Sequence, residues 1–130
     1  LWFWKAAIHS IGHAPLTGAG SGDVQSAMNS SYLQTSAPLE KAWFKRPHNQ
    51  FLTVAVALGI PGFIVFIFSL FFPPVHLFRR LHLLFWPFFL LAISSFMMED
   101  TLETQAGLTF FAFFNSLFLP LAGRDQEGTS

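Results

Sequence analysis

The sequence predicts an all-α integral membrane protein, with about three transmembrane helices preceded by an external helical segment. Hydrophobic residues make up 52% of the chain and charged residues only 11%, whereas a soluble globular domain carries about 25% charged residues. The shortage of charge is concentrated in uncharged runs of 32, 18 and 20 residues, at 47–78, 81–98 and 104–123. Because an apolar helix of about 20 residues spans a bilayer, we expect each run to contain a span.

The composition also excludes several classes of protein. So few charged residues exclude a water-soluble enzyme and a disordered chain. Seven Lys and Arg against seven Asp and Glu leave no basic excess to attract phosphate backbones, so no nucleic-acid partner is expected. The absence of Cys excludes a disulfide framework and thiolate chemistry. The chain starts at Leu1 without a recognisable signal peptide, and we expect it to be the C-terminal part of a larger membrane protein.

Residues 1–48 are predicted to form an external segment of helices and loops. Two Trp residues in the opening stretch favour a helix over residues 1–12 at the membrane–water interface, where Trp is enriched. A proline and a run of glycines at 15–22 break this helix. Asp23 then suits the N-cap of a second helix that runs to about Leu33.

The membrane domain is predicted over residues 49–122 and is followed by a cytoplasmic tail at 123–130. We expect its spans at about 49–72, 83–98 and 105–121. Asn49 is a good N-cap for the first span. Glycine and proline at 59–62 lie in the middle of this span and predict a kink there.

The short loops predict the orientation of the spans. Loop 73–82 holds Arg79 and Arg80 and no acid, whereas loop 99–104 holds three acids and no base. Because positive residues remain on the cytoplasmic side, we expect 73–82 and the C-terminus to face the cytoplasm. The 1–48 segment and loop 99–104 would then share the external face.

A cluster of polar residues, Arg46, His48 and Asn49, stands where the external segment meets the first span. In one interpretation Arg46 only snorkels at the interface and Asn49 only caps a helix. In the other, the free N–H groups and partial positive charge of the helix N-terminus favour an anionic ligand. Arg46 adds a donor fork suited to phosphate oxygens. The same positive end should disfavour the charged form of His48, leaving a neutral imidazole that can accept a proton.

Other titratable residues offer weaker hypotheses. Three acids share the predicted external face with His48: Glu99, Asp100 and Glu103. They form either a solvated turn or a group in which one carboxylate, with Glu103 favoured, orients His48 or a catalytic arginine. His9 and His13 have a spacing that could bind a metal ion, but no third ligand is evident. We therefore expect neither a metal nor another cofactor.

Three motifs resemble the C-terminal domain shared by bacterial O-antigen ligases and O-antigen polymerases. The stretch RPHNQFLTVAVALGIPG at 46–62 is similar to that family's His-Asn pair followed by an apolar helix with a Gly-x-x-Gly element. Upstream, WKAAIHSIGHAPLTGAGSGDV at 4–24 resembles its Trp-containing helix followed by Pro-Leu-x-Gly-x-Gly. Downstream, EDTLETQAGLTFFAFFNSLF at 99–118 resembles its acidic external segment and aromatic last helix.

The resemblance implies a multi-pass glycosyltransferase of the bacterial inner membrane whose active-site face is periplasmic. Such an enzyme transfers a glycan from a polyprenyl-diphosphate donor to a lipid A–core or glycan acceptor hydroxyl. The family's essential histidine maps onto His48, which would activate that hydroxyl. We assign His48 as the catalytic residue, and Arg46, Asn49 and Glu103 as substrate-binding residues. The family's diphosphate-binding arginines lie in upstream segments absent from this chain, so we expect the chain alone to be inactive.

Two alternatives from other functional classes stay open at this point. A membrane transporter or flippase subunit would also use a kinked span and an Arg-His pair at the membrane edge, without glycosyl transfer. A non-catalytic membrane anchor would not depend on His48 at all.

Overall fold

The computed structural model describes residues 2–35, 38, 44, 46–76, 83 and 85–124, with side chains for all of these except 73–76 and 119–124. Within these residues the fold is entirely helical, which confirms the predicted all-α class. The elements are α1 (Trp2–His13), α2 (Val24–Gln34), α3 (Gln50–His76), α4 (Phe85–Met98), the short 3-10 helix η2 (Thr101–Glu103) and α5 (Gln105–Arg124). Residues 77–82 of the predicted cytoplasmic loop, which include Arg79 and Arg80, and the last six residues of the tail lie outside the described residues.

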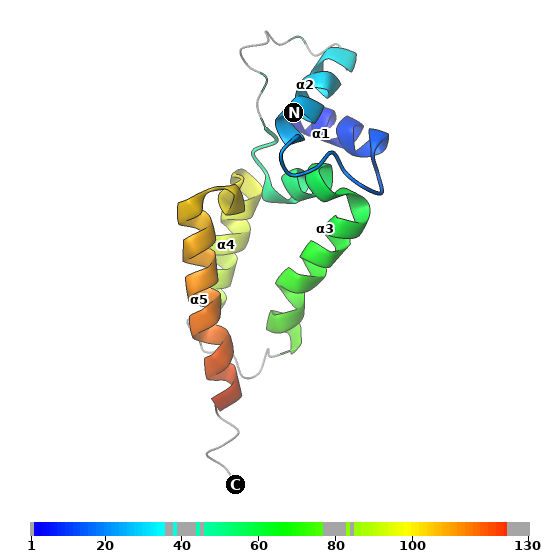
Figure 1. Cartoon of the computed structure of the whole chain (residues 1–130). Helices are drawn as coiled ribbons and strands as arrows, with labels where there is room; N and C mark the ends of the chain where they lie inside the picture. Colours follow the sequence, from blue (N-terminus) through cyan, green and yellow to red (C-terminus); the bar gives the residue numbers. More distant parts are fainter. Residues whose placement is uncertain are drawn as a thin grey trace.

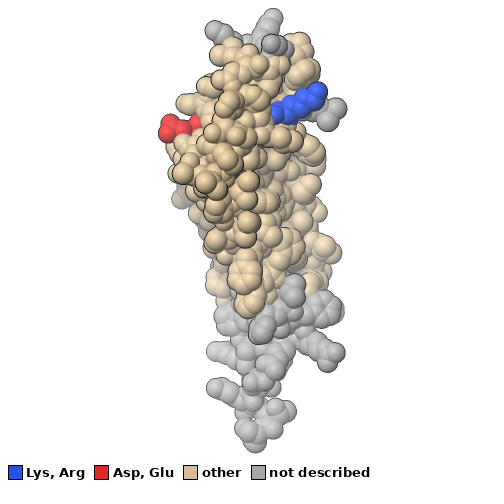
Figure 2. Space-filling view, turned by 90° about the vertical axis from the view of Figure 1, so that its right-hand side faces the viewer, with Lys and Arg blue, Asp and Glu red and all other residues tan. Residues whose placement is uncertain are grey.

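The helices form two regions (Figure 1). α1 and α2 gather with the start of α3 at one end of the molecule, and η2 lies at the same end. The rest of α3 runs away from this end, as do α4 and α5. All described charged side chains belong to the first region or border it: Lys5, Asp23, Arg46, Glu99, Asp100 and Glu103. On the face shown in Figure 2, the acidic and basic side chains accordingly lie near one end and the other described residues are uncharged.

Helix α3 is interrupted at Gly59, as the glycine and proline residues at 59–62 predict. Gly59 has φ 68° and ψ −172°, a conformation outside the helical region that glycine adopts without steric cost. Pro61 has no N–H group, so it cannot bond to the carbonyl of Ala57 four residues earlier. The interruption leaves backbone groups on both sides of Gly59 that need partners from elsewhere in the chain.

The loop between α1 and α2 supplies those partners. The N–H groups of Ala19 and Gly20 donate to the carbonyls of Val56 and Ala57, at 2.8 and 2.9 Å. In return, the N–H of Ile60 donates to the carbonyl of Pro15 at 2.7 Å. The approach is so close that a Cβ atom on Gly59 would lie 2.8 Å from the Pro15 carbonyl oxygen. The predicted kink is therefore a break between two helical segments that meet at Gly59, and the α1–α2 loop bridges it by hydrogen bonds.

The structure bears on the predicted spans only through the length and composition of the described helices. Among the described residues, one helical stretch, Gln50–Phe72, is long and apolar enough to cross a membrane, judged by length and composition. Helix α4 has 14 residues, which is shorter than the bilayer core requires. Among the described residues the first predicted span is thus a candidate by length and composition, and it is bent at Gly59; the other two spans stay predictions.

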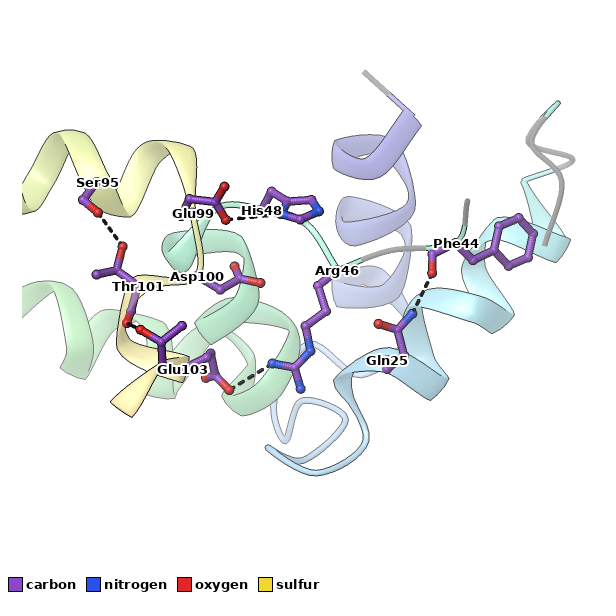
Figure 3. A pocket seen from close by; sticks show the side chains of 10 residues that line it. Gln25, Phe44, Arg46, His48, Ser95, Glu99, Asp100, Thr101 and Glu103 are labelled. Carbon is purple, nitrogen blue, oxygen red and sulfur yellow. Dashed lines mark hydrogen bonds and ion pairs between the residues drawn. The ribbon is translucent and has the colours of Figure 1, made fainter. Parts of the chain in front are cut away.

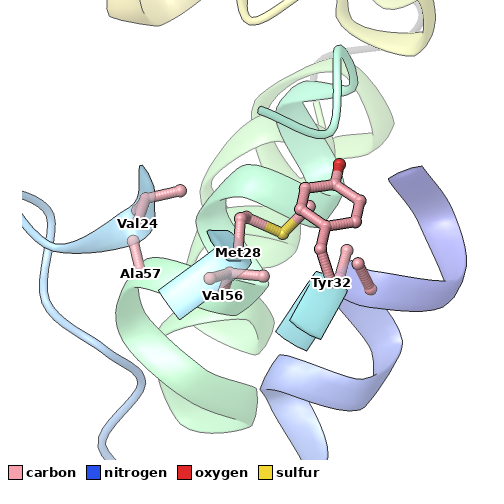
Figure 4. Packing of buried hydrophobic residues seen from close by; sticks show 7 residues of the cluster. Val24, Met28, Tyr32, Val56 and Ala57 are labelled. Atoms are coloured by element: carbon pink, nitrogen blue, oxygen red, sulfur yellow. The ribbon is translucent and has the colours of Figure 1, made fainter. Parts of the chain in front are cut away.

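Two clusters of buried side chains hold the regions together. The first joins α1, α2 and the start of α3 and contains Ala6, Ala7, Val24, Met28, Tyr32, Val56 and Ala57 (Figure 4). Burial in this cluster raises the pKa of Tyr32 to about 12. The second joins the far part of α3 to α4 and α5 and contains Leu70, Phe85, Phe88, Phe89, Phe96 and Phe118. The many phenylalanines thus pack mainly between helices.

Candidate functional site

The predicted site residues lie on a sharp turn that leads into α3. His48 has φ 49°, in the left-handed region that a residue with a side chain rarely adopts. Its neighbours are fixed, because Pro47 is buried and Asn49 is only 4% exposed. The Oδ1 atom of Asn49 accepts the N–H of Leu52 at 3.1 Å, so the predicted N-cap is confirmed. The His48 side chain is 45% exposed between these anchors.

The carboxylate of Asp100 covers the N-terminus of α3. One of its oxygens, Oδ1, accepts the backbone N–H of Asn49 at 3.1 Å and the hydroxyl of Thr53 at 2.6 Å. A carboxylate is favoured there by the partial positive charge of the helix end. The sequence suggested this helix end as a place for an anionic ligand. The structure corrects that expectation for the Asn49 N–H, because its partner is an acid of the chain itself.

Two further hydrogen bonds fasten the end of α4 and the acidic segment after it, residues 99–103, to the same turn. The Asn49 side-chain amide donates from Nδ2 to the carbonyl of Met97 at 3.1 Å. The side-chain oxygen of Gln50 accepts the N–H of Leu102 at 2.7 Å. Because Gln50 and Asn49 are both buried, these bonds satisfy polar groups that water does not reach. The acidic segment is thereby held at a fixed distance from the His48 turn.

Two acids of this segment each contact one predicted site residue. Glu103 Oε2 lies 3.0 Å from Arg46 Nη1, and Glu99 Oε2 lies 3.4 Å from His48 Nδ1. The acids are therefore not merely a solvated turn. The sequence favoured Glu103 as the acid that orients His48 or an arginine, and the structure places Glu103 at Arg46 and Glu99 at His48.

The imidazole of His48 is flanked on two sides. Glu99 faces Nδ1, and the ring of Phe3 from α1 meets the imidazole edge-on, with 6.1 Å between ring centroids. A carboxylate beside Nδ1 favours the tautomer with a proton on that nitrogen. Nε2 then carries the lone pair, and His48 can accept a proton from a hydroxyl group.

These contacts surround one pocket of about 660 Å³ (Figure 3). This volume lies in the range of about 300–1,000 Å³ that is typical of small-molecule sites. The lining residues are Gln25, Phe44, Arg46, His48, Ser95, Glu99, Asp100, Thr101, Glu103 and Thr104. Three of the four predicted site residues, Arg46, His48 and Glu103, thus line the same pocket. Asn49 is not among them and lies behind His48 as the helix cap.

Sequence reasoning missed several lining residues, Ser95 and Thr101 among them. Their hydroxyl oxygens lie 2.7 Å apart and form one wall of the pocket. Nothing in the sequence marks them, because isolated Ser and Thr residues are common on helices and turns. The His9–His13 pair lies in α1, with ring centroids 4.6 Å apart. In the described part of the chain, no group of three or more His, Cys, Asp or Glu could hold a metal ion.

A comparison with protein families matches residues 1–67 to the family described as O-antigen ligase. The match covers just over half of the 130 residues and includes Arg46, His48 and the interruption of α3 at Gly59. Comparisons with curated proteins and with solved structures gave no significant match. The matched region contains the turn that presents His48, one of the residues that line the pocket described above. The chain belongs to the O-antigen ligase family.

Proposed function

We propose that the chain supplies the catalytic base of a membrane glycosyltransferase of the O-antigen ligase/polymerase type. In this reaction a glycan moves from a polyprenyl-diphosphate donor to a hydroxyl of a lipid A–core or glycan acceptor. The observation that carries the proposal is the contact of 3.4 Å between His48 Nδ1 and Glu99 Oε2 beside a pocket of ligand size. The family match over residues 1–67 supports the same activity.

The proposed chemistry follows from the His48 environment. Glu99 accepts a hydrogen bond from Nδ1–H, and the unprotonated Nε2 can then remove the proton of the acceptor hydroxyl. As that oxygen attacks the anomeric carbon of the donor sugar, the new glycosidic bond forms and the bond from the sugar to the diphosphate breaks. The diphosphate leaves with the bonding electrons and is a good leaving group without protonation. One base in the pocket is therefore sufficient on the acceptor side.

The other assigned residues divide into two groups in this proposal. Arg46 and Glu103 line the pocket and contact the substrate directly. Glu103 occupies one nitrogen of the guanidinium, which has five N–H donors in all. Asn49 acts behind the pocket, because its side chain caps α3 and bonds to Met97, and this holds the His48 turn in place. A direct substrate contact by Asn49 stays a prediction.

We place the apolar helices in the bacterial inner membrane, with the pocket on the periplasmic side. Exposed apolar side chains recur every four residues along the far part of α3: Ile60, Ile64, Phe68 and Phe72. Such a stripe suits contact with lipid or with another transmembrane helix. Because the chain contains no Cys, single-cysteine variants report topology without background. In intact spheroplasts an impermeant thiol reagent should label Ser30→Cys and spare Arg79→Cys, whereas the reverse pattern would invert the orientation.

The transferase activity is tested with the intact protein in membranes, a lipid-diphosphate-linked glycan and an acceptor. His48→Ala should reduce formation of the glycosidic product by about 10²–10⁴-fold, as expected when a general base is lost. His13→Ala is the matched control, because His13 is an exposed histidine of α1 that does not line the pocket. Wild-type turnover by His48→Ala would remove the catalytic assignment.

A flippase or transporter subunit is a second candidate, and the interruption of α3 is the observation that favours it. Discontinuous helices are common at the substrate sites of transporters, and α3 is interrupted at Gly59. The assay above separates the two functions. A transporter moves the lipid-linked glycan across the membrane and forms no glycosidic bond.

A further inference from the structure

The described residues that line the pocket carry more negative than positive charge. Three carboxylates, on Glu99, Asp100 and Glu103, face one guanidinium, on Arg46. The net charge of these described lining residues is −2 with His48 neutral and −1 with His48 protonated. A diphosphate is itself multiply negative, so this lining repels it unless cations from outside the described chain intervene.

Among the described lining residues Arg46 carries the one guanidinium, and it does not offset this repulsion. Arg46 is already paired with Glu103 at 3.0 Å, so an incoming phosphate must compete with a carboxylate of the chain. The N-terminus of α3, the other positive feature nearby, is covered by Asp100. Both features that could attract an anion therefore have an acid of the chain as their partner.

The same lining is well suited to a sugar that carries several hydroxyl groups. Ionised carboxylates only accept hydrogen bonds, and hydroxyl groups can donate to them. The side chains of Glu99 and Glu103 are 69% and 39% exposed, so both carboxylates are accessible from the pocket. Arg46 supplies donors, and the Ser95–Thr101 hydroxyl pair, which shares one hydrogen bond, has further capacity to donate or accept.

We infer that this pocket, which receives the acceptor in the proposed function, selects a neutral or amino-bearing sugar over one that carries a carboxylate or a phosphate. The inference rests on the proposed function and names the substrate class at that site. Glu103 is then a selectivity residue, because its charge opposes an anionic acceptor.

The test uses three probes that differ in charge at one carbon: methyl glucoside, its 6-amino-6-deoxy analogue and methyl glucuronide. Their affinities for the intact wild-type protein are measured by ligand-observed NMR in lipid nanodiscs. We expect the glucuronide to bind about tenfold more weakly than the glucoside, which corresponds to about 1.4 kcal/mol. The amino sugar should bind at least as tightly as the glucoside. Added salt should reduce these differences, because exposed charges are screened.

Glu103→Gln should reduce the discrimination against the glucuronide by several-fold. Asp23→Asn is the matched control, since it removes the same charge from an exposed residue that does not line the pocket. Equal or tighter binding of the glucuronide by the wild type would overturn the inference, and so would failure of all three probes to bind. Equal effects of Glu103→Gln and Asp23→Asn would also overturn it.

Product formation in the transferase assay is measured separately, so the two proposals can fail independently. Discrimination among the probes without any glycosidic product would refute the proposed function and leave the charge selectivity of the pocket supported. Glycosidic product without discrimination among the probes would refute the inference alone.

Discussion

Asp100 and Glu99 are adjacent carboxylates with different roles. Replacing Asp100 by alanine should lower stability, whereas replacing Glu99 by alanine should lower turnover with little change in stability. Asp100→Ala removes the acceptor for the Asn49 N–H and the Thr53 hydroxyl. Thr53 is fully buried and Asn49 nearly so, so both donors lose a partner in places that water reaches poorly. An unsatisfied buried donor costs about 1–3 kcal/mol. Since Asp100 itself is partly exposed and water can enter where it was, we expect a loss of about 2–4 kcal/mol of unfolding free energy.

The assay is unfolding of the detergent-solubilised intact protein, followed by tryptophan fluorescence, with turnover measured on the same samples. Asp100→Asn keeps an oxygen acceptor without the charge and should lose about half as much stability as Asp100→Ala, because charge-assisted hydrogen bonds are about twice as strong as neutral ones. Glu99→Ala removes the same charge from a side chain that is 69% exposed. Its stability should stay within about 0.5 kcal/mol of wild type, while turnover falls because His48 loses its partner. Equal stability of Asp100→Ala and Glu99→Ala would refute the reasoning.

Three further predictions concern the scaffold around the site. Gly59→Ala should destabilise the protein strongly, because the new Cβ meets the Pro15 carbonyl and φ is positive. Gly12→Ala is the control and should be harmless, since its Cβ meets nothing within 4 Å. The midpoints of thermal unfolding of the two variants are compared. Tyr32 is the single tyrosine, so tyrosinate absorbance should titrate with a pKa of about 12 in the folded protein and near 10 after denaturation. Because the folded pKa is raised, the stability due to protonated Tyr32 is fully present below pH 10 and is lost as pH rises toward 12, which denaturant titrations at several pH values can check.

Features of the fold that depend on residues close together in the sequence could be predicted. The Asn49 cap of α3 was predictable because Asn49 follows a proline and precedes an apolar run, and both are visible in the local sequence. The interruption near Gly59 was predicted in the same way, from glycine and proline inside a helix. The direction of the chain beyond Gly59 was not predictable, because it depends on hydrogen bonds from a loop about forty residues upstream.

The sequence could not predict which acid of the 99–103 segment contacts Arg46 and which contacts His48. The sequence indicated that the acids and the Arg46–His48 turn share one face, and their contacts agree with that. Which acid meets which partner depends on how the start of α3 packs against the segment after α4. The two contacts join residues 51 and 57 positions apart. The acid beside His48 is therefore Glu99, although the local sequence had favoured Glu103 as the orienting carboxylate.

The central claim is that His48 removes a proton from the acceptor, and chemical rescue tests it most directly. In His48→Ala, the missing ring leaves space beside Glu99 that a soluble imidazole can enter from the open pocket. We predict that turnover of His48→Ala is lost and that added imidazole restores part of it, with a dependence on pH that follows the neutral form of the added base. Wild-type turnover by His48→Ala without imidazole would contradict the claim.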